Sequence, residues 1–267
     1  MFAKINHLAI TSDLYAVNAR FYQALFGMKA GDSNGRPARA VPVSDGQIGL
    51  NNIPRRDGKR SGLDHFGFEV ENMQLALERM HKFDPTLEYV KRPAVRPNAA
   101  FSAHDPDMII FDLAERNSGK AKDIFAAAAW DQQRYINHIA LRVRNPERSA
   151  EFYATVFELT PGNQTEDGVW RVSDGRVTLV LMPWKMSDFV GQDPTPPQIE
   201  HFGFKVESVA AIKREMDELV GVNPQFVTKP LGYGDEGAAR MKMFTQCPMG
   251  EFHLTDIEGV YIDVSER

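Results

Sequence analysis

The sequence has a single cysteine, Cys247, no apolar run of membrane-spanning length and no excess of basic residues. One cysteine excludes an intrachain disulfide framework and is compatible with a reducing compartment. A formal net charge of −5 without a basic stripe argues against a nucleic-acid-binding protein. The missing apolar run argues against a membrane-spanning helix. These absences predict a soluble cytoplasmic protein whose partner is neither nucleic acid nor a membrane.

The N-terminus shows no targeting segment, because residues 1–5 lead directly into an apolar, strand-like run. We therefore expect no secretory leader. The 267 residues, of which 43% are hydrophobic and 25% charged, have the composition of an average globular protein. This length allows two domains of ordinary size.

A long internal repeat is the most informative feature of the sequence. Its two halves each contain two short phrases with a histidine, and matched histidines are 131 and 136 residues apart. A repeat of this kind indicates homologous halves with histidines at matched places. The phrases are Ile5-Asn6-His7-Leu8-Ala9, echoed by Ile136-Asn137-His138-Ile139-Ala140, and Asp64-His65-Phe66-Gly67-Phe68, echoed by Glu200-His201-Phe202-Gly203-Phe204.

Each histidine phrase opens the same order of elements: a strand, an amphipathic helix and further strands. Capping residues precede each expected helix, namely Ser12 or Asp13, Asn72, Asn145 and Ser208. Gly221 is expected to end the last of these helices. The expected helices cover about 14–26, 72–83, 146–159 and 209–220. The expected strands lie at about 4–11, 63–70, 108–113, 169–173, 177–183, 199–206, 239–246 and 259–264, and the region 36–53 is expected to hold two or three more.

Two segments lie outside this pattern. Residues 117–134 predict a linker with a helical piece at Ile124–Trp130, which would separate an N-terminal domain, 1–116, from a C-terminal domain, 135–267. The proline-rich loop 184–198 either covers a site or only connects two strands, and the sequence leaves both roles open.

The four modules resemble the vicinal oxygen chelate superfamily, which includes glyoxalases, bleomycin-resistance proteins, epimerases and extradiol dioxygenases. The resemblance rests on the histidine phrases, on the aromatic pairs Phe21-Tyr22 and Phe152-Tyr153, and on the closing turns at 105–107 and 256–259. It covers nearly the whole chain outside the linker. It implies an α+β fold in which four βαβββ modules pair into two open β-barrel cups with the helices outside.

The resemblance also implies a divalent metal held by the opening strands and by a carboxylate of the closing strand. Matched to this pattern, the second half offers His138, His201 and Asp263. The first half offers a second set, His7, His65 and Asp112. Both halves depart from the superfamily by having aspartate where glutamate is usual.

Two imidazoles and one carboxylate suit Fe(II), with Mn(II) or Zn(II) as alternatives, and leave coordination positions open for substrate and dioxygen. Glu115 and Glu266 lie three residues beyond the two aspartates, on the opposite strand face. They are the fallback carboxylates if the aspartates do not bind.

Three further residues of the second half are candidates for the reaction. His253 lies ten residues before Asp263, where the first half has Ser102, and could act as an acid or a hydrogen-bond donor to substrate. Arg240 and Lys242 alternate with methionines on an expected strand and could bind an anionic substrate group. Because these residues are special to the second half, we expect the second half to be the active one.

Three function classes follow from the resemblance. A glyoxalase-type site uses a fourth ligand, a glutamate, but the corresponding positions fall near Gly49 and Thr178. A three-ligand site favours an extradiol-type dioxygenase that cleaves a small dihydroxylated aromatic compound. The position of the expected catalytic histidine falls near Phe244, so His253 would have to replace it. A metal-dependent lyase or isomerase is the alternative, and a metal-free binding protein is the third class. A homo-oligomer remains open.

Overall fold

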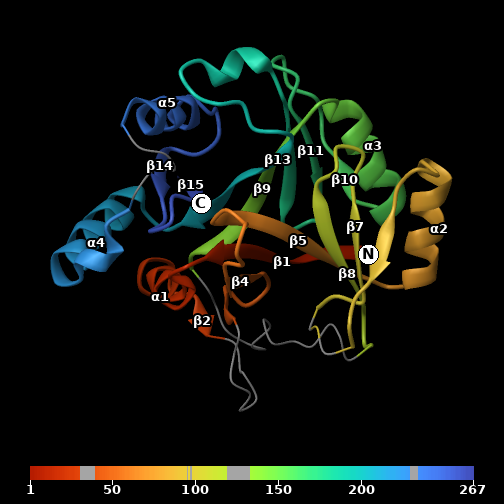
Figure 1. Cartoon of the computed structure of the whole chain (residues 1–267), viewed down its shortest axis with the longest axis horizontal. Helices are drawn as coiled ribbons and strands as arrows, with labels where there is room; N and C mark the ends of the chain where they lie inside the picture. The colour runs from red at the N-terminus through yellow and green to blue at the C-terminus, as the bar shows by residue number, and fades with distance from the viewer. Residues whose placement is uncertain (31–39, 95, 97, 119–132, 229–233) are drawn as a thin grey trace.

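The strands form two mixed sheets that lie side by side in the molecule (Figure 1). The computed structural model describes residues 1–30, 40–94, 96, 98–118, 133–228 and 234–267. Within these residues the first sheet has eight strands in the order β2-β3-β4-β1-β5-β8-β7-β6. The second has seven, in the order β10-β11-β12-β9-β13-β15-β14.

The first sheet is built entirely from the first half of the chain and the second sheet from the second half. The strands of the first sheet are β1 (Ala3–Ser12), β2 (Lys29–Ala30), β3 (Val41–Ser44), β4 (Gly49–Pro54), β5 (Gly62–Val70), β6 (Tyr89–Lys91), β7 (Phe101–His104) and β8 (Ile110–Glu115). Those of the second are β9 (Tyr135–Val143), β10 (Thr160–Pro161), β11 (Trp170–Ser173), β12 (Thr178–Pro183), β13 (Gln198–Val206), β14 (Phe252–Thr255) and β15 (Tyr261–Glu266).

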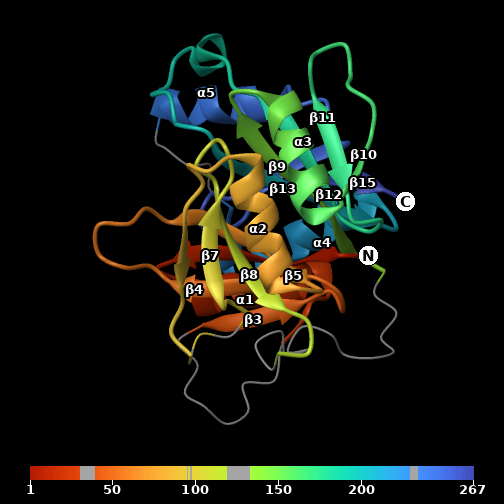
Figure 2. The same ribbon diagram turned by 90° about the vertical axis from the view of Figure 1, so that its right-hand side faces the viewer.

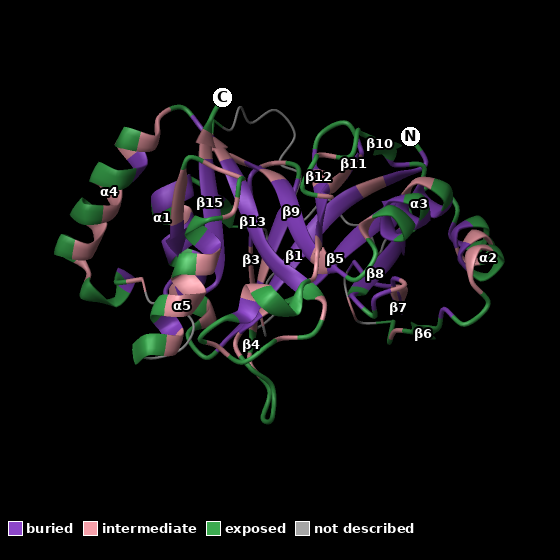
Figure 3. Cartoon of the chain, turned by 90° about the horizontal axis from the view of Figure 1, so that it is seen from above, coloured by how far each residue is buried: buried purple, intermediate pink, exposed green. Residues whose placement is uncertain are grey.

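The pairing of the opening strands is the same in both halves. β1 runs antiparallel to β5 and parallel to β4, and β9 runs antiparallel to β13 and parallel to β12. Each sheet has free end strands, so neither closes into a barrel. The buried central strands run through the middle of the molecule, and α2 and α4 lie at its two ends (Figure 3). The predicted α+β fold of paired modules is confirmed.

The helices begin and end at residues that explain their boundaries. They are α1 (Tyr15–Phe26), α2 (Met73–Phe83), α3 (Pro146–Phe157), α4 (Val209–Val222) and α5 (Gly234–Thr245), with short 3-10 turns η1 (Met186–Phe189) and η2 (Pro224–Phe226). The predicted caps Asn72, Asn145 and Ser208 each accept a backbone N–H of the first turn. None of the described helices is long and apolar enough to cross a membrane.

Three sequence predictions of element boundaries are wrong. Neither Ser12 nor Asp13 caps α1; the carboxylate of Glu258, from the other half, accepts the N–H of Leu14 instead. The helix α4 continues through Gly221 to Val222. The expected strand at 239–246 is part of α5. The expected linker helix at Ile124–Trp130 and most of the expected linker lie outside the described residues.

The helices α1 and α3 pack on strands of their own half, and each also places aromatic rings against the sheet of the other half. Phe26 of α1 stacks on Phe204 of β13 with ring centroids 3.8 Å apart, and Phe157 of α3 stacks on Phe68 of β5 at 4.2 Å. As a result α1 lies beside α4, and α2 lies beside α3 (Figures 1 and 2). The two halves therefore share one apolar core.

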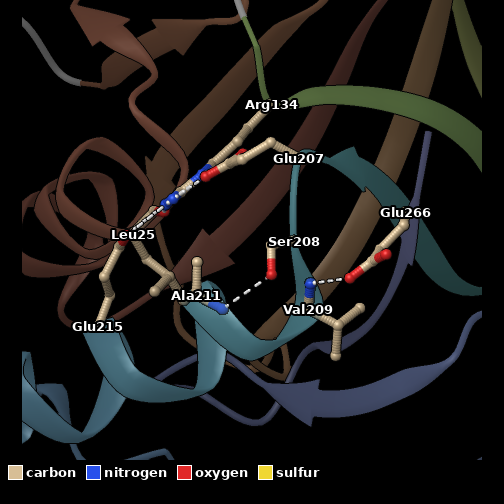
Figure 4. A network of polar contacts seen from close by, with 8 residues as sticks. All are labelled: Leu25, Arg134, Glu207, Ser208, Val209, Ala211, Glu215 and Glu266. Atoms are coloured by element: carbon tan, nitrogen blue, oxygen red, sulfur yellow. Dashed lines mark hydrogen bonds and ion pairs between the residues drawn. The ribbon is translucent and has the colours of Figure 1, made fainter.

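Arginine and carboxylate contacts reinforce this interlocking. Arg134, just before β9, makes ion pairs with Glu207 and with Glu215 of α4, and it also donates to the carbonyl of Leu25 at the end of α1 (Figure 4). One guanidinium group thus joins α1, α4 and the start of the second sheet. Its five donors make it suited to such a junction.

Two buried aspartates in the closing turns anchor tyrosines of the opposite half. The Tyr153 hydroxyl donates to Asp105 at 2.8 Å, and the Tyr22 hydroxyl donates to Asp256 at 2.9 Å. Asp105 also accepts two backbone N–H groups of its own turn. Burial raises the pKa of Asp105 from its ordinary 3.8 to about 6, against these hydrogen bonds.

The raised pKa predicts how Asp105 affects stability. A carboxyl group whose pKa is higher in the folded protein stabilises the fold below pH 3.8, and this contribution is lost as the pH rises through 6. Asn keeps the shape and the two backbone hydrogen bonds at Oδ1, its Nδ2 donates to the Tyr153 oxygen instead of accepting from it, and it does not titrate. We therefore expect the stability of Asp105→Asn relative to the unmodified protein to rise by roughly 2 kcal/mol between pH 4 and pH 7. Urea unfolding across this range tests it, and parallel stability curves would contradict it.

Candidate metal centres

Each of the four repeated histidines follows a residue that the strand pairing skips. The ladder between β1 and β5, and that between β9 and β13, pass over the residue before each histidine as irregularities in register. A regular strand would point neighbouring side chains to opposite faces, whereas a bulge re-aims them. Each preceding side chain consequently contacts Nδ1 of its histidine. The N···O distances are 2.7 Å for Asn6–His7, 2.6 Å for Asp64–His65, 3.1 Å for Asn137–His138 and 3.0 Å for Glu200–His201.

These contacts determine which ring nitrogen faces the cluster. The acceptor oxygen at Nδ1 makes this nitrogen the N–H donor, so Nε2 is directed to the centre, as in metal-ligating histidines generally. The orienting role of these four residues was not predicted from the sequence. The signal was present in the repeat, because a polar residue before each histidine interrupts an otherwise apolar strand.

The structure brings both predicted ligand sets together. In each set, one ligand atom from each of two histidines and an aspartate lie within 4.8 Å of one another, and all six residues are buried. In the second cluster, Asp263 Oδ2 lies 2.7 Å from His138 Nε2 and 3.2 Å from His201 Nε2. The two imidazole rings are 5.7 Å apart and nearly perpendicular, at 87°.

The second cluster contains buried polar atoms without hydrogen bonds. Nε2 of His138, Nε2 of His201 and both carboxylate oxygens of Asp263 have no hydrogen-bond partner despite their proximity. Buried groups of this kind are costly unless a cation binds them. Three electron-pair donors directed at one point therefore fit a divalent metal ion.

The charges of the second cluster support this interpretation. Burial raises the pKa of Asp263, but the two imidazoles outweigh it and hold the pKa far below its ordinary value, so the group is ionised. Burial lowers the pKa of His138. His201 differs, because Asp263, Cys247 and Glu200 together outweigh burial and raise its pKa. A metal ion binds only neutral imidazole, so metal binding would release any proton that His201 holds.

The first cluster has the same three residue types, but its aspartate has additional hydrogen-bond and ion-pair partners. His65 Nε2 lies 3.3 Å from Asp112 Oδ2, and the rings of His7 and His65 are 5.4 Å apart. Burial is the main cause that lowers the pKa of His7 to about 3. Asp112 also accepts a hydrogen bond from the Ser102 hydroxyl and makes an ion pair with Arg96.

A glycine faces one histidine of each cluster. Gly67 pairs with His7, and Gly203 pairs with His138, across the opening strands. A Cβ atom at these positions would lie 2.1 Å and 2.0 Å, respectively, from the histidine Cε1 atoms. The His-Phe-Gly-Phe phrase therefore contains glycine because the imidazole ring occupies the space of a side chain.

Neither cluster gains a fourth ligand from the neighbouring strand. Gly49 of β4 lies opposite His7, and Thr178 of β12 lies opposite His138, in the predicted positions. In the described parts of the chain each cluster contains three residues with ligand atoms. The fallback carboxylates Glu115 and Glu266 are in neither cluster. Glu266 instead accepts the N–H of Val209 at the start of α4 (Figure 4).

His253 lies directly opposite Asp263 in the β14–β15 ladder, just as Ser102 lies opposite Asp112. Opposite residues in such a ladder share a face, so His253 lies on the side of the second cluster. Its Nε2 contacts the carbonyl of Met249 at 2.7 Å, and its ring packs edge-on against Phe244.

Arg240 and Lys242, the residues predicted to bind substrate, do not lie on the expected strand. Arg240 and Lys242 lie on α5 instead of a strand, and they line separate cavities of about 580 and 550 Å³. Arg240 makes an ion pair with Glu236 one helical turn away. The first cavity is also lined by Glu200 and Tyr261, the residues that adjoin and pair with His201.

Phe244 and the following loop cover the second cluster. Phe244 packs against His201, with centroids 5.1 Å apart, and stacks on Tyr261 at 4.5 Å. A Cβ at Gly250 would lie 2.6 Å from Asp263. The loop 184–198 adds Phe189 to the 580 Å³ cavity, and its turn η1 contacts α5. The first cluster, in contrast, lines a cavity of about 480 Å³ with His65 and Asp112.

Comparisons with known proteins agree with this fold. Residues 135–262 match the family model of the Glyoxalase/Bleomycin resistance protein/Dioxygenase superfamily. No curated protein matches the sequence. Among solved structures, the Mn(II)-bound glyoxalase from Novosphingobium aromaticivorans is 13% identical, with a TM-score of 0.64 over 99% of this chain and 82% of that chain.

Two further structures are dioxygenases by title. A catechol 2,3-dioxygenase is 11% identical, with a TM-score of 0.63 over 100% of this chain and 88% of that one. A xylose isomerase-like TIM barrel/4-hydroxyphenylpyruvate dioxygenase fusion protein is 14% identical, with a TM-score of 0.60, and this chain spans 49% of its length. At these identities the likeness shows the fold alone.

The repeat, the paired sheets and the matched clusters define a duplicated architecture with two histidines and one aspartate brought together in each half. The second half of the chain, residues 135–262, matches the model of the Glyoxalase/Bleomycin resistance protein/Dioxygenase superfamily, and the first half repeats its histidine phrases.

Proposed function

We propose that the chain is a metal-dependent dioxygenase that cleaves the ring of a small dihydroxylated aromatic compound. The metal, Fe(II), would be held by His138, His201 and Asp263. The observation that carries this proposal is the set of buried ligand atoms without hydrogen bonds in the second cluster. A metal-free binding protein would have no reason to retain it.

The number of ligands favours oxygen chemistry. Three protein ligands leave up to three positions of an octahedral ion open, which is enough for a bidentate substrate and dioxygen. Iron held by these three residues would supply the redox chemistry of ring cleavage. A fourth carboxylate ligand, suited to proton transfer in an isomerase, is missing at Thr178. The solved structures titled as dioxygenases support the same choice.

The chain's own residues would position the substrate and move protons. His253, on the face of Asp263, would donate a hydrogen bond or a proton to the bound substrate. Arg240 would bind an anionic group in the 580 Å³ cavity. Because Phe244 packs against both His201 and Tyr261 of this cavity, we expect substrate binding to displace its ring.

The test is oxygen consumption by Fe(II)-loaded protein with a panel of catechols. We expect consumption with at least one catechol and a ring-cleaved product with extended conjugation, both absent in His201→Ala. The likeness to an Mn(II)-bound glyoxalase keeps a lyase or isomerase as the alternative. If no oxygen is consumed while hemithioacetal or epimerase assays turn over, the dioxygenase proposal is wrong and the alternative replaces it.

A further inference from the structure

The two clusters differ in what neutralises the aspartate. In the second cluster, two imidazoles face Oδ2 of Asp263, and Oδ1 has no hydrogen-bond partner. Among the described residues, no lysine or arginine makes an ion pair with Asp263. The negative charge of the second cluster is thus balanced only by a proton or by an ion that binds from solution.

In the first cluster a cation of the chain itself is in place. Nη2 of Arg96 lies 3.3 Å from Asp112 Oδ2, the same oxygen that faces His65 Nε2 at 3.3 Å. The other oxygen, Oδ1, accepts the Ser102 hydroxyl, and Ser102 in turn accepts a hydrogen bond from Nε of Arg92 at 2.5 Å. Both lone-pair regions of Asp112 are therefore directed at donors.

A guanidinium group is incompatible with a metal at this point. Arginine remains protonated in proteins and has no lone pair to offer a metal. Its N–H groups contact the oxygen that a metal ion would need, and its charge repels a divalent cation a few ångströms away. At an effective dielectric constant of 20, such repulsion weakens metal affinity by about 10³-fold or more.

The asymmetry follows from two differences between the halves. Arg92 follows directly after β6, and Arg96 lies a few residues further on. The second half has α5 where the first half has β6, and His253 where the first half has Ser102. Phe244 of the α5 segment, an apolar residue, packs on His201. The second half consequently covers its cluster without adding a positive charge.

We propose that Arg96 takes the place of the metal in the first cluster, so that the chain binds one metal ion and not two. The first cluster is then a charge-balanced, metal-free site that retains the ligand residues of a metal centre. Removal of the Arg96 charge would convert it into a second metal site. The count of one rests on the proposed metal site of the second half, whereas the role of Arg96 does not.

Metal content of protein purified without chelator or affinity metal tests this proposal. We expect one ion per chain in the unmodified protein, two in Arg96→Met, which keeps an unbranched apolar stem without the charge, and one in Arg96→Lys, which keeps the charge. Arg56→Ala is the matched control, because Arg56 lines the same cavity without an ion pair to the cluster, and should leave one ion. Reconstitution with Co(II) should show absorption bands of the second ion only in Arg96→Met.

The same variants in a His201→Ala background separate the two proposals. There we expect no ion with Arg96 present and one ion with Arg96→Met. A wild-type chain without metal, together with one ion in Arg96→Met/His201→Ala, would overturn the proposed function but support the role of Arg96. Two ions in the wild-type chain, or one ion in a folded Arg96→Met, would overturn the role of Arg96. If Arg96→Met does not fold, loss of an ion from His65→Ala would overturn it equally.

Discussion

Replacing His201 by alanine is expected to reduce bound metal to less than about 0.1 ion per chain and to abolish turnover. His201 is fully buried, and its Nε2 is one of the three atoms directed at the site. Loss of one of three protein ligands removes a third of the protein's coordination of the ion and leaves Asp263 with one imidazole. Elemental analysis and the oxygen electrode measure the two effects.

His65→Ala is the matched control for this prediction. His65 occupies the equivalent place in the first cluster, follows an equivalent acidic residue and is also buried. Its loss leaves Asp112 with Ser102 and Arg96, so we expect unchanged metal content and a loss of stability of about 1–3 kcal/mol. Equal loss of activity in both variants would mean that the halves work together.

The residues of the two clusters could be predicted because duplication marks them. His138 and His201 each have a counterpart at a matched place, and so does Asp263, so that a chance histidine is distinguished from a repeated one. What the repeat could not show was the register irregularity at Asn137 and Glu200. A bulge depends on the partner strand, and no local pattern specifies it.

The segment that covers the second cluster was predicted wrongly for a specific reason. Arg240, Met241, Lys242 and Met243 alternate in polarity, which favours a strand by period. The same residues, with the alanines before them, are strong helix formers, and Glu236 lies four residues before Arg240 to form an ion pair. Here helix propensity outweighed a short alternation of polarity, and the residues expected on a basic strand face lie on the helix α5.

The contacts between the two halves could not be predicted from the sequence. The amphipathic patterns of α1 and α3 show that each buries one face, but a pattern does not say which sheet receives it. The buried aspartates Asp105 and Asp256 are part of the answer, because each needs the tyrosine of the opposite half. The two closing turns resemble those of the superfamily, but their sequence does not predict the hydrogen bonds to the tyrosines.

Gly203→Ala is expected to weaken metal binding by about 100-fold without removing any ligand. The added Cβ would lie 2.0 Å from Cε1 and 2.7 Å from Nε2 of His138, far below any tolerated contact. Gly203 has no left-handed backbone conformation, so the effect is steric alone. The ring must swing away from Asp263, and misplacement of a ligand has large effects on affinity and rate.

Gly67→Ala provides the same clash in the other half. Its Cβ would lie 2.1 Å from Cε1 of His7, so both variants should lose similar stability, by about 1–3 kcal/mol for overpacking. If the second cluster alone binds the metal, only Gly203→Ala should lower metal affinity in a competition titration against a chelator. Equal affinity in the two variants would show that the position of the His138 ring does not matter for metal binding. The metal would then have to lie elsewhere than between His138, His201 and Asp263.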